Sequence, residues 1–403
     1  MKILVLNSGS SSQKSALFEI GLEPSADPVP PLWEGKLEWN GNVEKLTIKN
    51  SHDAEIRDQS RAADQKTSIE RLLRNLWSGP TAVLKAPTEI GVVGHRIVHG
   101  GPKLSDPTII TAEVRQAIED VSSIAPLHNR AGLQGIHIIE RLLGNTPQVA
   151  VFDTGFHRTL PPAAKVYPGP YEWYKRGIHR YGFHGINHQY CAQRAARLLQ
   201  KDISFLRILT CHLGNGCSLA AISAGKSIDT TMGFTPLEGL MMGTRSGSID
   251  PGILVHLMRS GESGDQLDGV LNHRSGLLGL SGISGDMRAI LEGIRSGNER
   301  SKLAFHVFVH RLQAGIGAMI TSMGGLDVLV FTAGIGENSP EVRRATCANL
   351  GFLGIQLDEA QNAAEANSDR SVSRQDASVR VFVIRAQEDW AIARECAQLC
   401  KPS

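Results

Sequence analysis

The chain has 403 residues, of which 41% are hydrophobic and 20% charged, a composition that excludes an intrinsically disordered protein. The 42 Lys and Arg residues nearly balance the 40 Asp and Glu residues, and the formal net charge of +2 provides no basic surface for nucleic acid or an anionic membrane. At about 150 residues per domain, this length predicts two or three domains.

Residues 2–6 (KILVL) form the first predicted element, a short buried strand. The run is shorter than the core of a signal peptide, which needs about seven apolar residues, and no apolar run approaches the roughly 18 residues of a membrane helix. The six cysteines include no C-x-x-C pair, which indicates free thiols in a reducing compartment. We therefore expect a cytoplasmic protein with no nucleic-acid or membrane partner.

The elements that follow alternate between strands and helices. Apolar residues at 69, 72, 73 and 76 fall at helical spacing and predict a helix within 60–77. Further strands are expected at 13–20, 90–98, 148–152, 326–332 and 379–384, and further helices at 131–143, 188–200, 251–259, 285–296, 300–323 and 388–400. This alternation favours an α/β fold.

Two segments of the chain resemble each other. Residues 3–16 (ILVLNSGSSSQKSA) align without a gap on residues 208–221 (ILTCHLGNGCSLAA). Chance similarity between strand–turn–strand units would give the same low identity, so the pattern does not prove a duplication. It predicts two β-hairpins with glycine- and hydroxyl-rich tips, one in each half of the chain.

Three glycine-rich segments are candidate phosphate sites. Residues 7–14 (NSGSSSQK) are not a P-loop, because Ser8 and Gln13 stand where glycines are needed. They form either a hairpin tip whose N–H groups surround a phosphate, with Lys14 adding charge, or a plain serine-rich loop. Residues 213–216 (LGNG) bring backbone close to a ligand or form an ordinary Asn-Gly turn.

The third segment is 329–341 (LVFTAGIGENSPE), in which a strand runs into a glycine-rich turn. Ser339 suits an N-cap and Pro340 the first position of the helix that follows. A helix N-terminus beside such a turn is typical of a nucleotide site, and a tight strand-to-helix connection explains the glycines equally well.

Five charged or titratable side chains are further candidates for the site. Arg96 and Arg245 lie in apolar or small-residue surroundings, and each needs a structural carboxylate or an anionic substrate as partner. Asp153 follows a strand, where α/β proteins place ligand groups, although an Asx turn is the simpler interpretation. His184 and His188 could form a metal pair, but ordinary buried histidines are the favoured interpretation. Phosphate loops, arginines and a carboxylate together indicate phosphoryl transfer.

At these residues the chain resembles the acetokinase family, over nearly its whole length. The matching blocks are NSGSSSQK (7–14), GHRIVHGG (94–101), APLHN (125–129), FDTGFH (152–157), YGFHG (181–185), HLGNG (212–216), MGFTPLEGLMMGTRSG (232–247), GDMR (285–288) and AGIGEN (333–338). Two departures are Ile186-Asn187 for the usual Thr-Ser, and AQEDW (386–390) for the usual TNEEL.

The resemblance implies a fold and an activity. The fold would be two duplicated actin-like ATPase (ribonuclease H-like) α/β domains with the active site in the cleft between them. We place the N-terminal domain at 1–156 plus 390–403 and the nucleotide-binding domain at 157–389. The activity would be reversible phosphoryl transfer from ATP to acetate, giving acetyl phosphate and ADP, in a homodimer.

The resemblance also implies roles for particular residues. Asn7 and Glu388 would hold Mg²⁺, or Mn²⁺ in its place. Acetate would lie against Arg96, with Val98, Leu127 and Pro236 around its methyl group. Catalysis would use Asp153, His184, Arg245 and Arg96. ATP would contact Ser10, Ser12, Lys14, His212, Leu213, Gly214, Asn215, Gly216, Asp286, Met287, Arg288, Gly334, Ile335, Gly336, Glu337 and Asn338.

Acetate is already ionised at pH 7, because its pKa is close to that of Glu, about 4. We therefore expect Asp153 to orient a partner, although the family assigns it proton transfer. The alternatives are a propionate or other short-chain carboxylate kinase, whose pocket differs by a methylene worth only about 1–3 kcal/mol, a non-catalytic nucleotide-binding switch, and a filament-forming protein.

Overall fold

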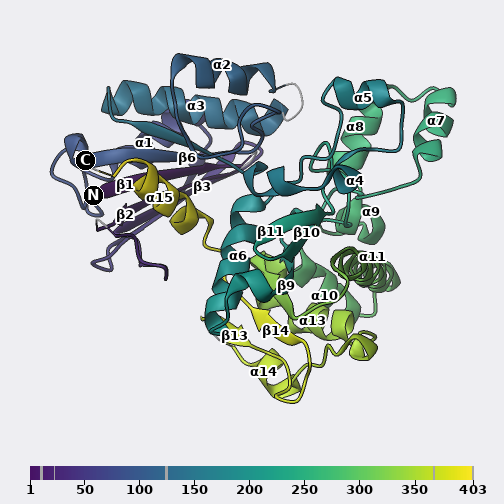
Figure 1. Ribbon diagram of the computed structural model, residues 1–403. Coiled ribbons are helices and arrows are strands. Elements are labelled where there is room, and N and C mark those ends of the chain that lie inside the picture. The colour runs from purple at the N-terminus through teal and green to yellow at the C-terminus, as the bar shows by residue number, and fades with distance from the viewer. Residues whose placement is uncertain (10–11, 22, 123–125, 366–367, 402–403) are drawn as a thin grey trace. The chain divides into compact units, whose positions relative to one another are not determined.

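The computed structural model describes residues 1–9, 12–21, 23–122, 126–365 and 368–401 (Figure 1). The chain divides into two compact units: unit 1 comprises Met1–Gly155 with Gln387–Ser403, and unit 2 comprises Phe156–Ala386. The C-terminal helix α15 (Glu388–Leu399) belongs whole to unit 1. The boundary expected between residues 389 and 390 would have cut this helix in its first turn.

Unit 1 is built on an eight-stranded sheet with the order β5-β4-β3-β2-β1-β6-β8-β7. Its strands are β1 (Lys2–Ser8), β2 (Ser12–Glu19), β3 (Trp33–Asn40), β4 (Val43–Asn50), β5 (Glu55–Arg61), β6 (Ile90–Ile97), β7 (Thr108–Ile109) and β8 (Gln148–Phe152). β1 to β5 are antiparallel neighbours, whereas β1, β6 and β8 run parallel. Its other helices are α1 (Gln65–Arg74), α2 (Ala112–Asp120) and α3 (Pro126–Leu143).

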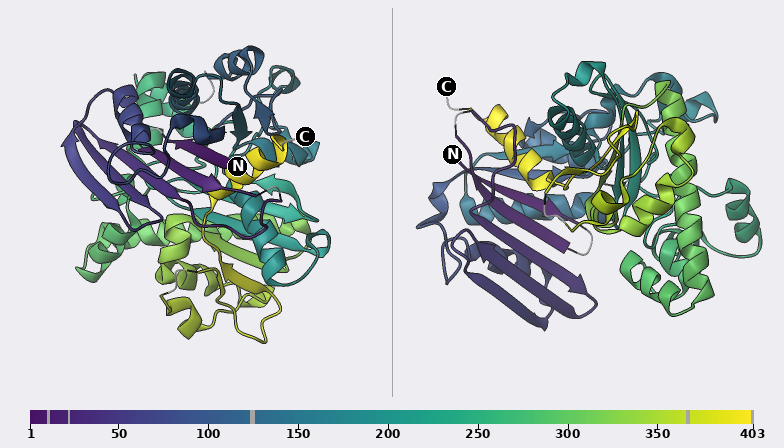
Figure 2. Two further views of the ribbon diagram at one scale, coloured as in Figure 1. Left: turned by 90° about the vertical axis from the view of Figure 1, so that its left-hand side faces the viewer. Right: turned by 90° about the horizontal axis from the view of Figure 1, so that it is seen from below.

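The strands β3, β4 and β5 were not predicted from the sequence. Figure 2 shows them as a twisted extension of the sheet. In β4, buried and exposed residues alternate strictly, so its apolar residues are separated by polar or charged ones and form no continuous run. Leu37 and Ile48 on the buried face belong to the same core cluster as Ile69 and Leu72 of α1, the helix whose spacing was predicted.

Unit 2 contains a six-stranded sheet with the order β11-β10-β9-β12-β14-β13. Its strands are β9 (Arg207–Leu213), β10 (Cys217–Ser223), β11 (Lys226–Thr230), β12 (Val328–Thr332), β13 (Arg370–Ser371) and β14 (Arg380–Val383). Its helices are α4 (Pro162–Lys165), α5 (Tyr171–Lys175), α6 (Gly185–Leu198), α7 (Pro251–Arg259), α8 (Gly264–His273), α9 (Gly276–Ser281), α10 (Met287–Arg295), α11 (Glu299–Met323), α12 (Ala333–Asn338), α13 (Pro340–Cys347) and α14 (Glu359–Ala363).

The two sheets repeat one topology. The order β3-β2-β1-β6-β8 in unit 1 corresponds to β11-β10-β9-β12-β14 in unit 2, with the same parallel and antiparallel pairings. The two predicted hairpins occupy equivalent places, β1–β2 and β9–β10. Their turns differ, since residues 9–12 separate the last paired residues of the first hairpin and residues 214–216 those of the second. The expected α/β fold with two duplicated sheets is therefore confirmed.

Within the part of the chain that the structure describes, α11 is long and apolar enough by composition to cross a membrane. A core helix passes the same test. Phe308, Leu312 and Ile316 of α11 are buried, and the helix packs against β10 and α9. We therefore interpret α11 as the core helix of unit 2.

Two buried histidines give a prediction for the pH dependence of stability. His95 Nε2 lies 2.7 Å from Gln148 Oε1 in unit 1, and His157 Nδ1 lies 2.8 Å from Ser227 Oγ in unit 2. Burial lowers the pKa of each to about 4. An unfolded histidine binds its proton below about pH 6.5, so the unfolded state binds more protons between pH 6.5 and 4. The free energy of unfolding should therefore fall as the pH decreases through this range.

The expected slope is about 1.4 kcal/mol per pH unit for each histidine. Thermal unfolding midpoints measured between pH 7 and pH 4.5 test this. His157→Gln should show a shallower decline than the unsubstituted chain, and parallel curves would contradict the assignment.

Candidate active site

Unit 1 brings four predicted side chains together at the carboxyl ends of its parallel strands. Arg96 lies in β6, and Asp153 directly follows the neighbouring strand β8. Arg96 Nη2 and Asp153 Oδ2 are 2.6 Å apart, with only 13% and 1% of the two side chains exposed. Burial alone would lower the pKa of Arg96, but Asp153 and Glu388 outweigh it and raise the pKa. Arg96 therefore has the carboxylate partner that its surroundings required.

Asn7, at the end of β1, links this ion pair to α15. Its Nδ2 donates to Glu388 Oε2 at 3.1 Å and to Asp389 Oδ1 at 2.9 Å, while its Oδ1 accepts from Arg96 Nη1 at 3.4 Å. Burial raises the pKa of Asp389, against the hydrogen bond from Asn7. Sequence analysis missed Asp389 as a site residue, although it replaces the second Glu of the family's TNEEL block.

The structure describes only some of the other site residues predicted in unit 1. Val98 is buried directly after β6. Ser12 begins β2, and Lys14 pairs with Asn7 in the β1–β2 ladder with its side chain exposed. Ser10 and the side chain of Leu127 lie outside the described residues.

In unit 2, His184 and Arg245 converge on the glycine turn between β9 and β10. A Cβ atom at Gly216 would lie 3.4 Å from His184 Nε2 and 3.6 Å from Arg245 Nη1. The His184 ring stacks on His212, with centroids 3.9 Å apart and planes 8° from parallel. His184 itself has φ +56°, a left-handed conformation that is unfavourable for a residue with a side chain. Because Gly216 has no side chain, the space beside His184 Nε2 and Arg245 Nη1 stays open.

Arg245 differs from Arg96 in its partners. Its Nη1 donates to Pro236 O at 3.3 Å and lies 4.0 Å from Met242 Sδ, and among the described residues no carboxylate pairs with it. Burial lowers the pKa of Arg245. A partly buried guanidinium without an acidic partner is favourable where an anion can bind beside it, which makes Arg245 a candidate for binding an anionic ligand.

Residues from three predicted segments, far apart in the sequence, line one cavity of about 500 Å³ in unit 2. It is lined by Gly214, Asn215, Gly285, Asp286, Met287, Arg288, Leu291, Gly334, Ile335, Asn338 and Ser339. Gly285, Leu291 and Ser339 were not predicted as site residues, although Leu291 lies one helical turn after Met287. His212, Leu213, Gly216, Gly336 and Glu337, which were predicted to contact ATP, do not line this cavity.

The glycine-rich stretch after β12 is a short helix, α12, and not the turn that was predicted. Ala333 begins it with φ +65°. Glu337 Oε1 accepts hydrogen bonds from the backbone N–H groups of Ala333 and Ala386, both at 2.8 Å. This carboxylate closes the helical turn and ties it to the segment after β14, which explains why Glu337 points away from the cavity. The predicted N-cap Ser339 and first-turn Pro340 of α13 are confirmed.

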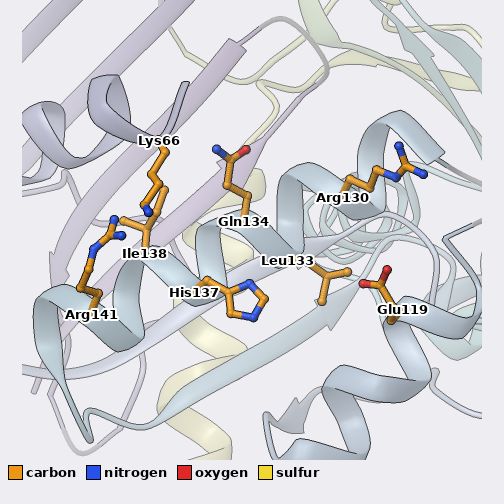
Figure 3. A pocket seen from close by; sticks show the side chains of 8 residues that line it. All are labelled: Lys66, Glu119, Arg130, Leu133, Gln134, His137, Ile138 and Arg141. Carbon is orange, nitrogen blue, oxygen red and sulfur yellow. The ribbon is translucent and has the colours of Figure 1, made fainter. Parts of the chain in front are cut away.

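A second hollow, of about 360 Å³, lies in unit 1 along α3 (Figure 3). Lys66, Arg130, His137 and Arg141 line it, with Leu133 and Ile138 beneath. Its basic side chains are exposed, and Arg141 is ion-paired with Glu70. It therefore lacks a partly buried charge without a carboxylate partner, the feature that distinguishes the Arg245 site.

Comparison with known proteins agrees with this geometry. The model of the acetokinase family matches residues 2–394. The chain belongs to the acetokinase family. It is 58% identical over 402 residues to an acetate kinase of Cyanothece sp., covering 99% of this chain and 98% of that protein, and 55% identical to one of Gloeobacter violaceus, covering 99% of each.

Two solved structures resemble this acetokinase closely. The acetate kinase of Porphyromonas gingivalis has a TM-score of 0.90 at 39% identity, covering 99% of each chain. A propionate kinase of Francisella tularensis subsp. tularensis has a TM-score of 0.88 at 37% identity, covering 98% of each chain. The backbone is therefore shared by proteins named for two different carboxylates.

The unit 2 cavity can be tested by filling it. A Cβ atom at Gly334 would meet no atom within 4 Å, and the residue lies in α12 without a positive φ. Gly334→Leu should therefore fold normally and project into the cavity, raising KM for ATP by at least about tenfold while KM for acetate changes little. Gly317→Leu, in α11 and with equally open surroundings, is the matched control. Equal KM for ATP in both variants would exclude this cavity as the nucleotide site.

Proposed function

We propose that this acetokinase transfers the γ-phosphoryl group of ATP to acetate, reversibly, giving acetyl phosphate and ADP. The observation that carries the proposal is Arg245, a partly buried arginine with no carboxylate partner among the described residues, beside a glycine turn that also lines a nucleotide-sized cavity. The identity of 52–58% to curated acetate kinases over nearly the whole chain supports acetate as the acceptor.

Unit 1 would bind the acceptor. Asp153 holds Arg96 through Nη2, which leaves Arg96 Nε, without a hydrogen-bond partner among the described residues, to donate to a small carboxylate. Because acetate is ionised at neutral pH, its oxygen is already nucleophilic and no general base is required. Asp153 then acts by fixing Arg96, and Val98 would contact the methyl group, with Leu127 from the same unit and Pro236 from unit 2.

Unit 2 would bind the donor. The cavity beside Gly214 and Asp286 would hold the nucleoside, and Arg245 and His184 would face the transferring phosphoryl group at Gly216. Phosphoryl transfer depends on positioning and charge neutralisation more than on covalent chemistry. In-line transfer requires the acceptor oxygen and the γ-phosphoryl group to be held close together and aligned.

The carboxylates of unit 1 fit a hard cation. Glu388 Oε2 and Asp389 Oδ1 both accept a hydrogen bond from Asn7 Nδ2, so the two carboxylates lie close together. Carboxylate oxygens are the ligands that Mg²⁺ prefers. We propose that Glu388, with Asp389 and Asn7 beside it, holds Mg²⁺. When bound, the cation neutralises phosphate charge and orients the phosphoryl group.

Trapping acyl phosphate as a hydroxamate tests the function directly. The chain should form product from ATP, Mg²⁺ and acetate, with a larger kcat/KM for acetate than for propionate or butyrate. No product from any short-chain acid would disprove the kinase, and a larger value for propionate would favour the other acceptor.

We further propose a cytoplasmic homodimer. Unit 2 exposes apolar side chains on two helices, Tyr171 and Trp173 on α5 and Ile253, Val255 and Met258 on α7. Exposed apolar groups of this kind are typical of subunit contacts. Sedimentation velocity should give twice the mass of one chain, and a monomer at micromolar concentration would contradict the assignment.

A further inference from the structure

A chain of hydrogen bonds runs from the core of unit 2 to His184. Thr210 Oγ1 lies 2.7 Å from His188 Nδ1, His188 Nε2 lies 2.7 Å from Ser218 Oγ, and Ser218 Oγ lies 2.9 Å from His184 Nδ1. Thr210, His188 and Ser218 are completely buried. His188 is therefore not a metal ligand paired with His184, because both of its ring nitrogens are already hydrogen-bonded.

Counting donors and acceptors fixes the direction of this chain. Within the described residues, Thr210 Oγ1 has no hydrogen-bond partner other than His188 Nδ1, so its hydroxyl proton is satisfied only by donation to that nitrogen. His188 then carries its proton on Nε2 and donates to Ser218, whose own hydroxyl donates to His184 Nδ1. In the reverse direction, the buried Thr210 hydroxyl would have no acceptor. Burial also lowers the pKa of His188 well below its ordinary value, which keeps the ring neutral.

The same reasoning applies to the neighbouring ring. His212 Nδ1 accepts from Asn187 Nδ2 at 2.8 Å, which places the His212 proton on Nε2. That nitrogen lies 3.8 Å from the Cβ position of Gly214, as His184 Nε2 lies 3.4 Å from that of Gly216. The two stacked rings therefore present their Nε2 sides to the same glycine turn.

We propose that Thr210, His188 and Ser218 hold the proton of His184 on Nε2, so that His184 is a neutral hydrogen-bond donor to the transferring phosphoryl group. The proposal rests on the proposed function. Ser218 and His188 are positioning residues that act through His184, and the positive charge at the turn comes from Arg245. His184 takes no part as a general acid or base, because its Nδ1 is occupied by the Ser218 hydroxyl.

Nitrogen NMR of the full chain labelled with ¹⁵N-histidine tests the proton positions. His184→Gln and His188→Gln assign the signals by their loss. At neutral pH, both rings should show a protonated Nε2 and an unprotonated Nδ1. A protonated Nδ1 on His184 would overturn the proposal. This measurement is made on the unsubstituted chain, so it does not depend on whether a Ser218 variant folds. It is also independent of turnover: correct proton positions in a chain that forms no acyl phosphate would overturn the proposed function and leave the assignment standing.

Ser218→Ala tests the link to catalysis. His184 Nδ1 then loses its only proposed donor, so its proton is no longer held on Nε2. We expect kcat to fall by about 10- to 100-fold, the range found for side chains that orient a metal ligand through a hydrogen bond. KM for ATP and acetate should stay within about threefold, and Ser218→Thr, which keeps the hydroxyl, should restore kcat. Ser227→Ala removes a comparable buried serine–histidine bond, that to His157, and should leave kcat unchanged. Unchanged kcat in Ser218→Ala would refute the positioning role.

Discussion

Arg245→Ala is expected to lower kcat by about 10³- to 10⁵-fold, the range for an arginine that neutralises a transferring phosphoryl group. The guanidinium has no competing carboxylate among the described residues, so its charge is fully available to the transition state. Its loss should affect kcat far more than KM for acetate, because the proposed partner of the acetate carboxylate is Arg96 of unit 1. Steady-state kinetics with the hydroxamate assay measure this effect.

The control for this variant is another arginine of unit 2. Arg207 is ion-paired with Asp327 at 2.9 Å on the surface, and surface pairs contribute little to stability. Arg207→Ala should therefore keep near-normal kcat. If Arg245→Ala retains kcat within tenfold of the unsubstituted chain, its role at the phosphoryl group is wrong.

Secondary structure is predicted best from the sequence where neighbouring residues alone determine it. The hairpins β1–β2 and β9–β10 are visible as apolar runs around glycine-rich tips, and Ser339 and Pro340 identify the start of α13. The strands β3 to β5 escape prediction because one face is solvated, so that their apolar residues never follow one another. The helix α12 escapes because its glycines indicate a turn, whereas Glu337 closes it as a helix by accepting from two backbone N–H groups.

The site residues divide in the same way. Residues 286–288 were predicted only because their block resembles the family, whereas 334–338 also follow a strand and a glycine-rich turn typical of a nucleotide site; part of each segment lines one cavity. Asp389 stands in a block that departs from the family's usual sequence, and Ser218 has no signal in the sequence, because its importance comes from the side chains it contacts. Ser218 connects two histidines, one of them 30 residues away in the sequence, and such a partner is not visible in a linear pattern.

Arg96→Ala is the second substitution with a large expected effect, a fall in kcat/KM for acetate of about 10²- to 10⁴-fold. The same guanidinium is proposed to bind the substrate carboxylate, and truncating one partner of a buried, hydrogen-bonded charge pair costs about 2–5 kcal/mol of binding free energy. KM for acetate should rise much more than KM for ATP, because the cavity in unit 2 is intact. Added guanidinium should restore part of the activity by refilling the space next to Asp153.

Asp153→Asn separates the two roles proposed for this carboxylate. As the residue that fixes Arg96, its replacement should lower kcat/KM for acetate while leaving the shape of the pH profile unchanged above the pKa of acetate. As a proton-transfer group, it would instead remove a limb of that profile. Because acetate is deprotonated throughout the neutral range, a lost limb would show that a proton moves elsewhere in the reaction. An unchanged profile in Asp153→Asn, together with guanidinium rescue of Arg96→Ala, would establish that the ion pair serves to orient the positive charge towards the acceptor.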